Sequence, residues 1–227
     1  MQRHKPPEPA LGAPTMDNFF SALKTQRWDD HRYYHHSRIN QSLHLLSALS
    51  FLASYALILL NHPAIAAWVA WMVAMVSRQS GHFFFEPKGY DHVNHATHEH
   101  KEQIKVGYNL KRKIVLLAVW AFAPVALAIN PTLFGAFPAP VRFTDYLEHV
   151  GITWFWIGVG GLAFRTIQLM IIKDFQTGIV WMSKILTDPF HDVMLYWRAP
   201  LALLRGELID PMHDVLEHEA SQAAHDA

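Results

Sequence analysis

The chain has 227 residues, about half of them apolar, and its 19 basic and 19 acidic side chains give a formal net charge of zero. This balance excludes nucleic-acid binding through bulk electrostatic attraction. The chain contains no cysteine and 16 histidines. Disulfides, thiolate zinc sites and iron–sulfur clusters are therefore excluded, and imidazole and carboxylate groups are left as the strong metal ligands.

Polarity is segregated along the chain into three predicted regions. Residues 1–30 begin with the proline-rich "MQRHKPPEPALGAPTMDN", which lacks an apolar centre and predicts a flexible tail rather than a signal peptide. In residues 31–210 apolar runs of near-membrane length alternate with charged segments, which is rare in soluble domains. We therefore predict a single all-α integral membrane bundle, followed by a polar tail over residues 211–227.

Four apolar segments are long enough to cross a hydrocarbon layer of about 30 Å, which takes roughly 20 helical residues. They cover residues 41–60, 64–85, 114–133 and 150–172. Pro124 predicts a kink in the third segment, which membrane helices tolerate. Two later apolar stretches, residues 179–186 and 192–209, are too short or interrupted to span, and we expect short interfacial or re-entrant helices there.

Basic residues predict the orientation of these segments. Lysine and arginine are concentrated before the first segment and between the second and third, whereas the loops on the other side contain only Arg142. By the positive-inside rule, both termini and the histidine-rich loop, defined as residues 86–113, are cytoplasmic. Fourteen of the 16 histidines then lie on the cytoplasmic side.

The first cluster of candidate ligands is "YHHSRINQSLH", residues 34–44. If a helix begins near Arg38, Asn40 and His44 lie one turn apart on the same face. His36 stands just before the first turn, where it can reach that face, and His35 can point back from the preceding loop. The stretch therefore offers two or three imidazoles and one amide at the end of the first segment.

The second cluster is "GHFFFE", in which His82 and Glu86 share a helix face at i and i+4. A very short turn joins the first two segments, so they must pack antiparallel and bring both clusters together. The loop sequence "HVNHATHEHKE" adds further imidazoles close in sequence. The predicted metal ligands are His35, His36, His44, His82, His95 and His98. The roles of His92, His100 and His191 stay open.

Neutral imidazoles with a few carboxylates and no thiolate suit iron or zinc. A site at the membrane boundary has access to both acyl chains and dissolved oxygen, so iron chemistry on lipids is the use that this donor set favours. Glu86 has two interpretations, as a direct ligand or as a carboxylate that holds an imidazole.

These residues also resemble a known family. "YHHSRINQSLH", followed by an apolar hairpin that ends in "GHFFFE", resembles the membrane-bound 2-hydroxy fatty acid dioxygenases of phytosphingosine degradation and their bacterial relatives. That family has a YHH-x3-N-x3-H motif and a GHxxxE motif, matched here by Tyr34, His35, His36, Asn40 and His44, and by Gly81, His82 and Glu86. The match covers about 55 residues, and more loosely residues 181–197. The chain departs from the family in having fewer apolar residues between the motifs, and in the histidine-rich loop and two spans that follow.

The resemblance implies an Fe(II)-dependent dioxygenase of fatty acid alpha-oxidation. Such an enzyme uses molecular oxygen to shorten a 2-hydroxy fatty acid by one carbon, without a 2-oxoacid cosubstrate. Histidines would hold Fe(II), and Asn40 and Glu86 would fix imidazole tautomers. We expect the substrate carboxylate to be neutralised by Lys88, Lys105 or Arg112.

Two other functions remain open. A di-iron desaturase or hydroxylase uses histidine boxes that "HxxHxH" at residues 95–100 partly imitates, although the usual HxxHH pairs are absent. A non-enzymatic metal transporter or assembly factor is also compatible with a histidine-rich loop. Transport normally requires polar groups deep in the spans, and the first and third segments have almost none at their centres.

Overall fold

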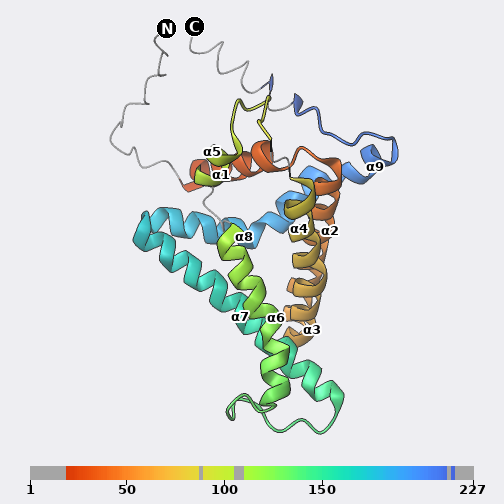
Figure 1. The fold of residues 1–227 in the computed structure, drawn as a ribbon, viewed down its shortest axis with the longest axis vertical. Helices are drawn as coiled ribbons and strands as arrows, with labels where there is room; N and C mark the ends of the chain where they lie inside the picture. The colour runs from red at the N-terminus through yellow and green to blue at the C-terminus, as the bar shows by residue number, and fades with distance from the viewer. Residues whose placement is uncertain (1–18, 87–88, 105–109, 214–215, 218–227) are drawn as a thin grey trace.

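The computed structural model describes residues 19–86, 89–104, 110–213 and 216–217, except for the side chains of residues 102–104 and 110–113. All regular elements in these ranges are helices, and the only β-type pairing there is two isolated bridges. Figure 1 shows a long bundle in which α1 and α8 cross one end of the other helices. The predicted all-α class is confirmed.

Helix α1 (Phe19–Tyr34) begins inside the region that the sequence predicts as a flexible tail. It packs against α8 (Phe175–Tyr196), where Arg27 Nε lies 3.2 Å from Asp188 Oδ1 and Asp30 pairs with Lys184. The proline-rich stretch that indicated a tail ends before α1, and the charged residues of α1 supply ion pairs that hold the helix in place.

Helix α2 (Arg38–Leu59) and the following helical run form the predicted antiparallel hairpin. Ser37 caps the start of α2, because its hydroxyl oxygen accepts a hydrogen bond from the backbone N–H of Asn40 at 3.4 Å. The turn at residues 60–62 includes Asn61 with φ of 64°, a left-handed conformation that asparagine tolerates, and Pro63 opens the next helix. That run consists of α3 (Pro63–Val69), η1 (Ala70–Met75), α4 (Val76–Ser80) and η2 (Gly81–Phe85), and the two η segments are π-helical.

The hairpin packs along its whole length, because α2 contacts every part of the second run from α3 to η2. The start of α2 therefore lies beside the end of η2, as expected from the short turn. π-Helical turns are uncommon and often mark functional sites. Here η2 carries His82.

Helix α6 (Leu110–Ile129) and helix α7 (Phe143–Ile172) follow the histidine-rich loop, in which α5 (His98–Ile104) is the described helix. The main apolar core lies between the second run, α6 and α7, and contains buried Trp71 and Trp154. The backbones of α3 and α7 approach closely, since a Cβ added to Gly151 would lie 2.6 Å from the Ala64 carbonyl oxygen.

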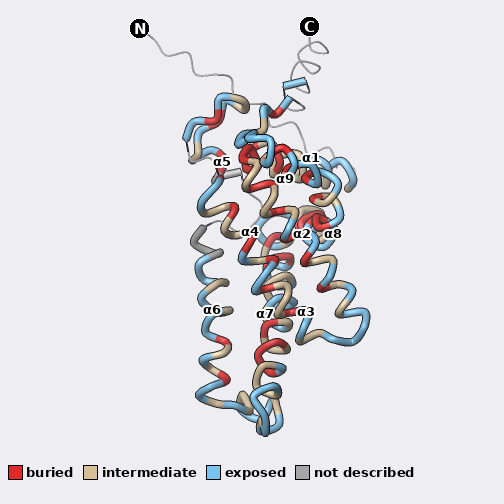
Figure 2. The backbone as a smooth tube through the Cα atoms, turned by 90° about the vertical axis from the view of Figure 1, so that its right-hand side faces the viewer, coloured by how far each residue is buried: buried red, intermediate tan, exposed pale blue. Residues whose placement is uncertain are grey.

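Helices α2 and α7 are long and apolar enough to cross a membrane, and the apolar part of α6, Ile114–Ile129, is shorter. Figure 2 shows that most of α6 is exposed or half-buried. Its exposed side chains include Ile114, Val115, Val119 and Phe122. An apolar outer surface of this kind is typical of contact with lipid or with another protein.

Helix α8 is one continuous helix of 22 residues, with Pro189 inside it, and α9 (Ala199–Leu204) follows. The sequence instead predicted short separate segments, because charged residues interrupt the apolar run. Those charges, Lys184, Asp188 and Asp192, are four residues apart and all buried. They lie on the inward face of a helix whose outer face is apolar, so they do not break it.

The segment after α9 returns to the start of α2. Ser37 and Ile209 form an antiparallel bridge, with the Arg38 amide donating to the Leu208 carbonyl at 2.9 Å and the Asp210 amide donating to the His36 carbonyl at 2.7 Å. The Gln41 side-chain amide also donates to Asp210 Oδ2 at 2.7 Å. The backbone at residues 36–38 is thus held from a part of the chain far away in sequence.

Candidate metal site

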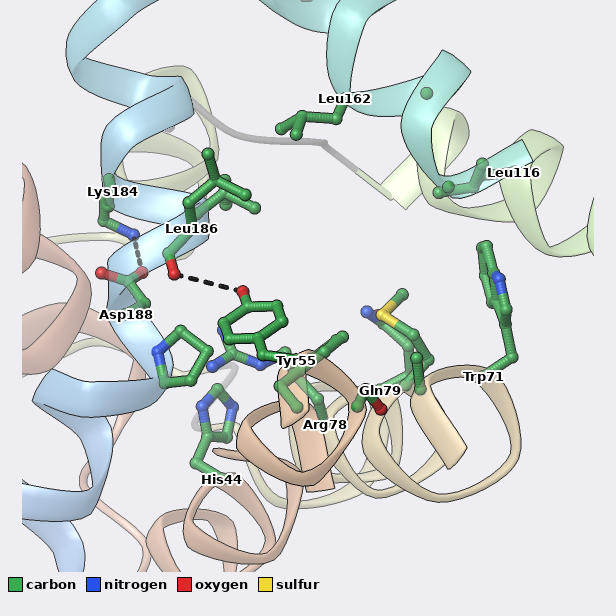
Figure 3. A pocket seen from close by; sticks show the side chains of 18 of the residues that line it. His44, Tyr55, Trp71, Arg78, Gln79, Leu116, Leu162, Lys184, Leu186 and Asp188 are labelled. Carbon is green, nitrogen blue, oxygen red and sulfur yellow. Dashed lines mark hydrogen bonds and ion pairs between the residues drawn. The ribbon is translucent and has the colours of Figure 1, made fainter. Parts of the chain in front are cut away.

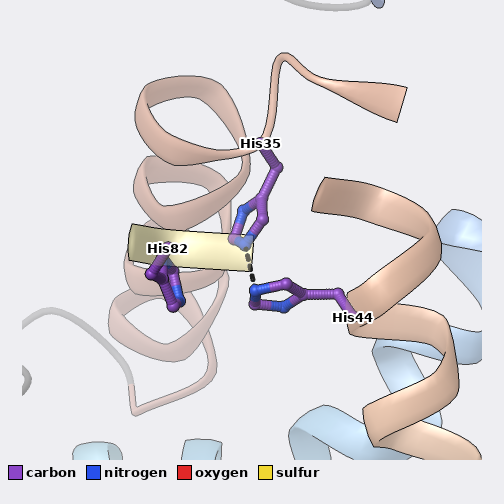
Figure 4. Close-up of side chains that lie close together, drawn as sticks. All are labelled: His35, His44 and His82. Atoms are coloured by element: carbon purple, nitrogen blue, oxygen red, sulfur yellow. Dashed lines mark hydrogen bonds between the residues drawn. The ribbon is translucent and has the colours of Figure 1, made fainter. Parts of the chain in front are cut away.

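Three of the predicted ligands meet at the end of the hairpin. The ligand atoms of His35, His44 and His82 all lie within 4.8 Å of one another, and we call these residues the histidine triad. Figure 4 shows their rings converging from the turn before α2, from α2 itself and from η2. The ring centroids are 4.2 Å apart for His35 and His44, 4.8 Å for His44 and His82, and 5.6 Å for His35 and His82.

Close packing between Asn40 and Gly81 sets the spacing of the triad. A Cβ at Gly81 would lie 2.1 Å from Asn40 Oδ1, so only glycine lets η2 approach α2 this closely. The Asn40 side-chain amide donates to the Tyr34 carbonyl at 2.8 Å. Asn40 therefore positions the turn that carries His35, and its expected role in fixing an imidazole tautomer stays a prediction.

The Nδ1 atoms of the triad are directed at oxygen atoms outside it. His35 Nδ1 lies 2.8 Å from the Asp30 carbonyl oxygen and His82 Nδ1 lies 2.8 Å from Glu86 Oε2. The carbonyl oxygen can only accept, and so can the carboxylate oxygen of an ionised Glu86. These two Nδ1 atoms therefore carry protons, and the Nε2 atoms of His35 and His82 keep lone pairs. His44 Nδ1 lies 3.8 Å from Asp192 Oδ2. That distance is beyond hydrogen-bond range, whereas the outer hydrogen bonds of His35 and His82 are of the kind that commonly orients histidines that bind a metal.

The inner nitrogens are unusually close. His35 Nε2 and His44 Nε2 are 3.2 Å apart. Because His35 carries its proton on Nδ1, its Nε2 accepts a hydrogen bond from His44 Nε2–H. A metal ion bound here would replace that proton and take the lone pairs of both Nε2 atoms. Burial lowers the pKa of His35 well below its ordinary value, and His44 and His82 add to this effect. The neutral imidazole that results is the form that binds metal ions.

Charged residues from α1, α4 and α8 lie around the triad, and those of α8 are buried. Arg78 pairs with Asp192, and Lys184 lies between Asp30 and Asp188, at 2.8 Å from the latter. Burial acts to lower the pKa of Lys184, but its two carboxylate partners outweigh it and raise the pKa. These five residues were not predicted as part of the site. The four-residue spacing of the charges in α8 was the available signal, since it places them on one helix face.

Tyr196 is a further residue that sequence reasoning missed. Its ring centroid lies 5.5 Å from that of His35 and 6.3 Å from that of His44, and its hydroxyl group is 3.2 Å from His31 Nδ1. Burial and the charge of Asp192 raise its pKa well above the ordinary value. The phenol therefore stays protonated beside the triad.

The triad opens into a cavity of about 450 Å³. Figure 3 shows His44 and Trp71 at opposite ends of this space. Near the triad the lining is polar and includes Arg78 and Lys184, whereas the remainder is mainly apolar and comes from α2, α3, η1, α6, α7 and α8. The volume is within the usual range for small-molecule sites, roughly 300 to 1,000 Å³.

The other predicted ligands lie elsewhere. His36 Nε2 is 2.6 Å from the Arg32 carbonyl oxygen and 3.4 Å from Asp91 Oδ2, so of the adjacent pair it is His35 that joins the triad. His95 is exposed and has φ of 48°, and half-buried His98 begins α5. Neither belongs to the triad.

The predicted carboxylate-binding residues cannot be placed against the site. Lys88 and Lys105 lie outside the described residues, as does the side chain of Arg112. Glu86 contacts His82 through a hydrogen bond, which corresponds to the orienting role rather than to the alternative of direct ligation.

No protein-family model, curated protein or solved structure matches the chain. The chemistry of the site therefore has to be argued from its geometry. Within the described ranges, the triad is the one group of at least three histidine or carboxylate residues arranged to hold a metal ion. Three neutral nitrogen donors suit iron or zinc and leave coordination positions open for a substrate.

Proposed function

We propose that the chain is a membrane-embedded Fe(II)-dependent dioxygenase that shortens 2-hydroxy fatty acids by one carbon. One observation carries the proposal: three convergent imidazoles stand at the polar end of an apolar cavity. The resemblance of the motifs around residues 34–44 and 81–86 to the 2-hydroxy fatty acid dioxygenases supports the same activity. Both motifs contribute to the triad.

We also propose that α2, the run from α3 to η2, α6 and α7 all cross the membrane. The apolar length of α2 and α7 and the exposed apolar surface of α6 support this arrangement. By the positive-inside rule, the triad then lies at the cytoplasmic side, together with the basic residues of α1. Helices α1 and α8 would lie along that surface, consistent with the way they cross the bundle in Figure 1.

The overall reaction balances with one molecule of oxygen. A 2-hydroxy acid, R–CH(OH)–COOH, and O₂ give R–COOH, CO₂ and H₂O; the bond between the first two carbons breaks, and four electrons pass from the substrate to oxygen. No external reductant or 2-oxoacid is needed. Fe(II), when bound by His35, His44 and His82, supplies Lewis acidity and the redox chemistry of oxygen.

The protein groups around the triad hold the substrate and the ligands in place. Glu86 keeps His82 in the tautomer that leaves Nε2 available. The Arg78 guanidinium lines the cavity beside the triad, where it can pair with a carboxylate. Arg78 is a candidate for this role within the described residues, and the roles of Lys88, Lys105 and Arg112 stay predictions. The apolar lining takes the acyl chain and keeps water from the reacting end.

Geometry disfavours the di-iron alternative within the part of the chain that the structure describes. The loop histidines His92, His95 and His100 are exposed and stand apart from the triad. A non-enzymatic zinc protein would have the same three ligands, and only a measurement of metal and turnover separates it from an oxygenase.

The decisive experiment measures bound metal and turnover in detergent-purified protein loaded anaerobically with Fe(II). We expect one iron per chain and oxygen uptake with 2-hydroxypalmitate that matches the CO₂ and pentadecanoic acid formed. Palmitate, which lacks the 2-hydroxyl group, is the control and gives no uptake. Two irons with a requirement for an electron donor would establish the hydroxylase alternative, and zinc without turnover would establish the non-enzymatic one.

A further inference from the structure

The cavity is long as well as apolar. On α2 its lining runs from His44 to Ile58, a separation of 14 residues or about 21 Å at the helical rise. One leaflet of a bilayer has a hydrocarbon thickness of about 15 Å, half of the usual 30 Å. The lining is therefore longer than one leaflet is thick, which is long enough for an acyl chain of a membrane lipid in extended form.

Partway along the cavity, short of its lining at Ile58 and Ala66, stands a rigid aromatic wall, which we call the tryptophan wall and define as Trp71, Trp120 and Trp154. Trp71 and Trp154 line the cavity, and Trp120 packs against both of them. The Trp71 indole N–H donates to the Trp154 carbonyl at 3.0 Å, and the Trp154 indole N–H donates to the Trp120 carbonyl at 2.9 Å. The Trp120 ring stacks on both of the others, with centroids 5.9 Å and 5.5 Å away. These contacts fix the wall, so it cannot easily yield to a longer ligand.

Gly158 of α7 lines the cavity beside this wall. A Cβ added there would meet one atom within 4 Å, Trp71 Nε1 at 4.0 Å. Glycine is a poor helix former, about 1 kcal/mol worse than alanine, and here it leaves open the space that a side chain would fill. The same helix contains Gly160, which does not line the cavity and has nothing within 4 Å of an added Cβ.

We propose that the space between Gly158 and the tryptophan wall holds the part of a long acyl chain that lies far from the head group, and so limits the chain length that the protein accepts. The inference rests on the proposed function for the head group at the triad, but the length limit is a property of the cavity alone. The ligand is a free fatty acid, because Arg78 lines the polar end: its Nη2 pairs with Asp192 and its Nε donates to Ser47, and its Nη1 can donate to a ligand carboxylate.

Replacing Gly158 by leucine tests this directly, with Gly160→Leu as the matched control on the same helix. Both changes improve helix propensity, and only the first fills the cavity. Retention of radiolabelled palmitate and octanoate by the purified full-length protein gives a readout that needs no turnover. Each methylene kept out of the apolar space weakens binding, and two of them account for about tenfold.

We expect Gly158→Leu to bind palmitate at least tenfold more weakly while keeping its octanoate affinity, and Gly160→Leu to match the wild type for both. Unchanged palmitate binding by Gly158→Leu, equal losses in both variants, or no fatty acid binding by the wild type would overturn the proposal. So would competition by a dipalmitoyl phospholipid as strong as that by palmitate, which would assign the cavity to membrane lipid. If binding follows expectation but the iron-loaded protein consumes no oxygen, the proposed function fails and the length limit stands.

Discussion

The histidine triad and the histidine-rich loop contain the same residue type in very different settings. The triad uses one histidine from each of three places, each fixed by packing, and its imidazoles are buried or half-buried. The loop holds its histidines close together in sequence, yet His92, His95 and His100 are exposed. A dense run of potential ligands does not make a site unless the surrounding backbone directs the side chains to one point.

The loop is nevertheless attached to the region around the triad. Tyr34 donates its hydroxyl proton to the Lys101 carbonyl at 2.5 Å, and the fully buried Lys101 ammonium group lies 3.3 Å from the Tyr33 carbonyl oxygen. Asp91 lies 3.7 Å from the same ammonium group and 3.4 Å from His36. The loop thus packs against the C-terminal end of α1 through residues other than its exposed histidines.

Removing a triad imidazole gives the largest expected effect. His44→Ala or His82→Ala should reduce bound iron below detection by elemental analysis and abolish oxygen uptake with 2-hydroxypalmitate, since two nitrogens cannot hold the metal against buffer. His95→Ala is the matched control in the loop and should keep both. Loss of iron in His95→Ala equal to that in the triad variants would show that the loop supplies a ligand.

Adding one methyl group at the contact between η2 and α2 should reduce metal binding slightly less. Gly81→Ala places a Cβ against Asn40 Oδ1, and the forced separation of η2 from α2 should lower iron affinity by about 10- to 100-fold, the range seen when outer contacts of a metal site are changed. Gly89→Ala, in the loop, has nothing within 4 Å of its new Cβ and should leave the affinity unchanged. Competitive titration with a chromophoric chelator measures both. A wild-type affinity for Gly81→Ala would exclude tight Asn40 packing as the determinant.

The next largest effect is expected from weakening the hydrogen bond between His82 Nδ1 and Glu86. Glu86→Gln keeps the shape of the side chain but loses the charge that strengthens its bond to His82 Nδ1, so we expect iron affinity to fall by about tenfold. Glu99→Gln in the loop serves as the comparison and should have no effect. If Glu86→Gln loses all bound iron, the carboxylate is a direct ligand instead.

The smallest expected effect concerns the pH dependence of stability. Burial, and then the charge of Arg27, lower the pKa of His191 in α8 below its ordinary value. The unfolded chain then binds a proton more readily, so stability is complete above the unfolded pKa of about 6.5 and declines as the pH falls below it. His191→Gln should flatten the decline in melting temperature between pH 7 and pH 5, measured in detergent without metal. An unchanged slope would mean that other groups cause it.

The sequence alone was sufficient for features with local periodicity. The i and i+4 spacing of His82 and Glu86 and the short turn at residues 60–62 led to a correct prediction of the hairpin and of the two clusters meeting. The choice between His35 and His36 was beyond local reasoning, because it depends on the bridge between Ser37 and Ile209 and on the Asp30 carbonyl.

The charged surroundings of the triad were missed for a related reason. Arg78, Asp192 and Lys184 interrupt apolar runs, so they reduced the apparent length of those segments instead of indicating a site. Their pairing links α1, α4 and α8, which are distant in sequence, and only tertiary packing shows which charge meets which. The identity of the residues was visible, but their partners were not.

The return of residues 208–210 to the start of α2 has a consequence for biosynthesis. Gln41 and its partner Asp210 are 169 residues apart, and the bridging segment is translated long after the triad histidines have left the ribosome. The turn that carries His35 therefore reaches its final conformation only after α7 and α8 have been made. The geometry of the triad is therefore complete only after residues 208–210 have been made, so a metal ion would bind there after the helical bundle has been translated.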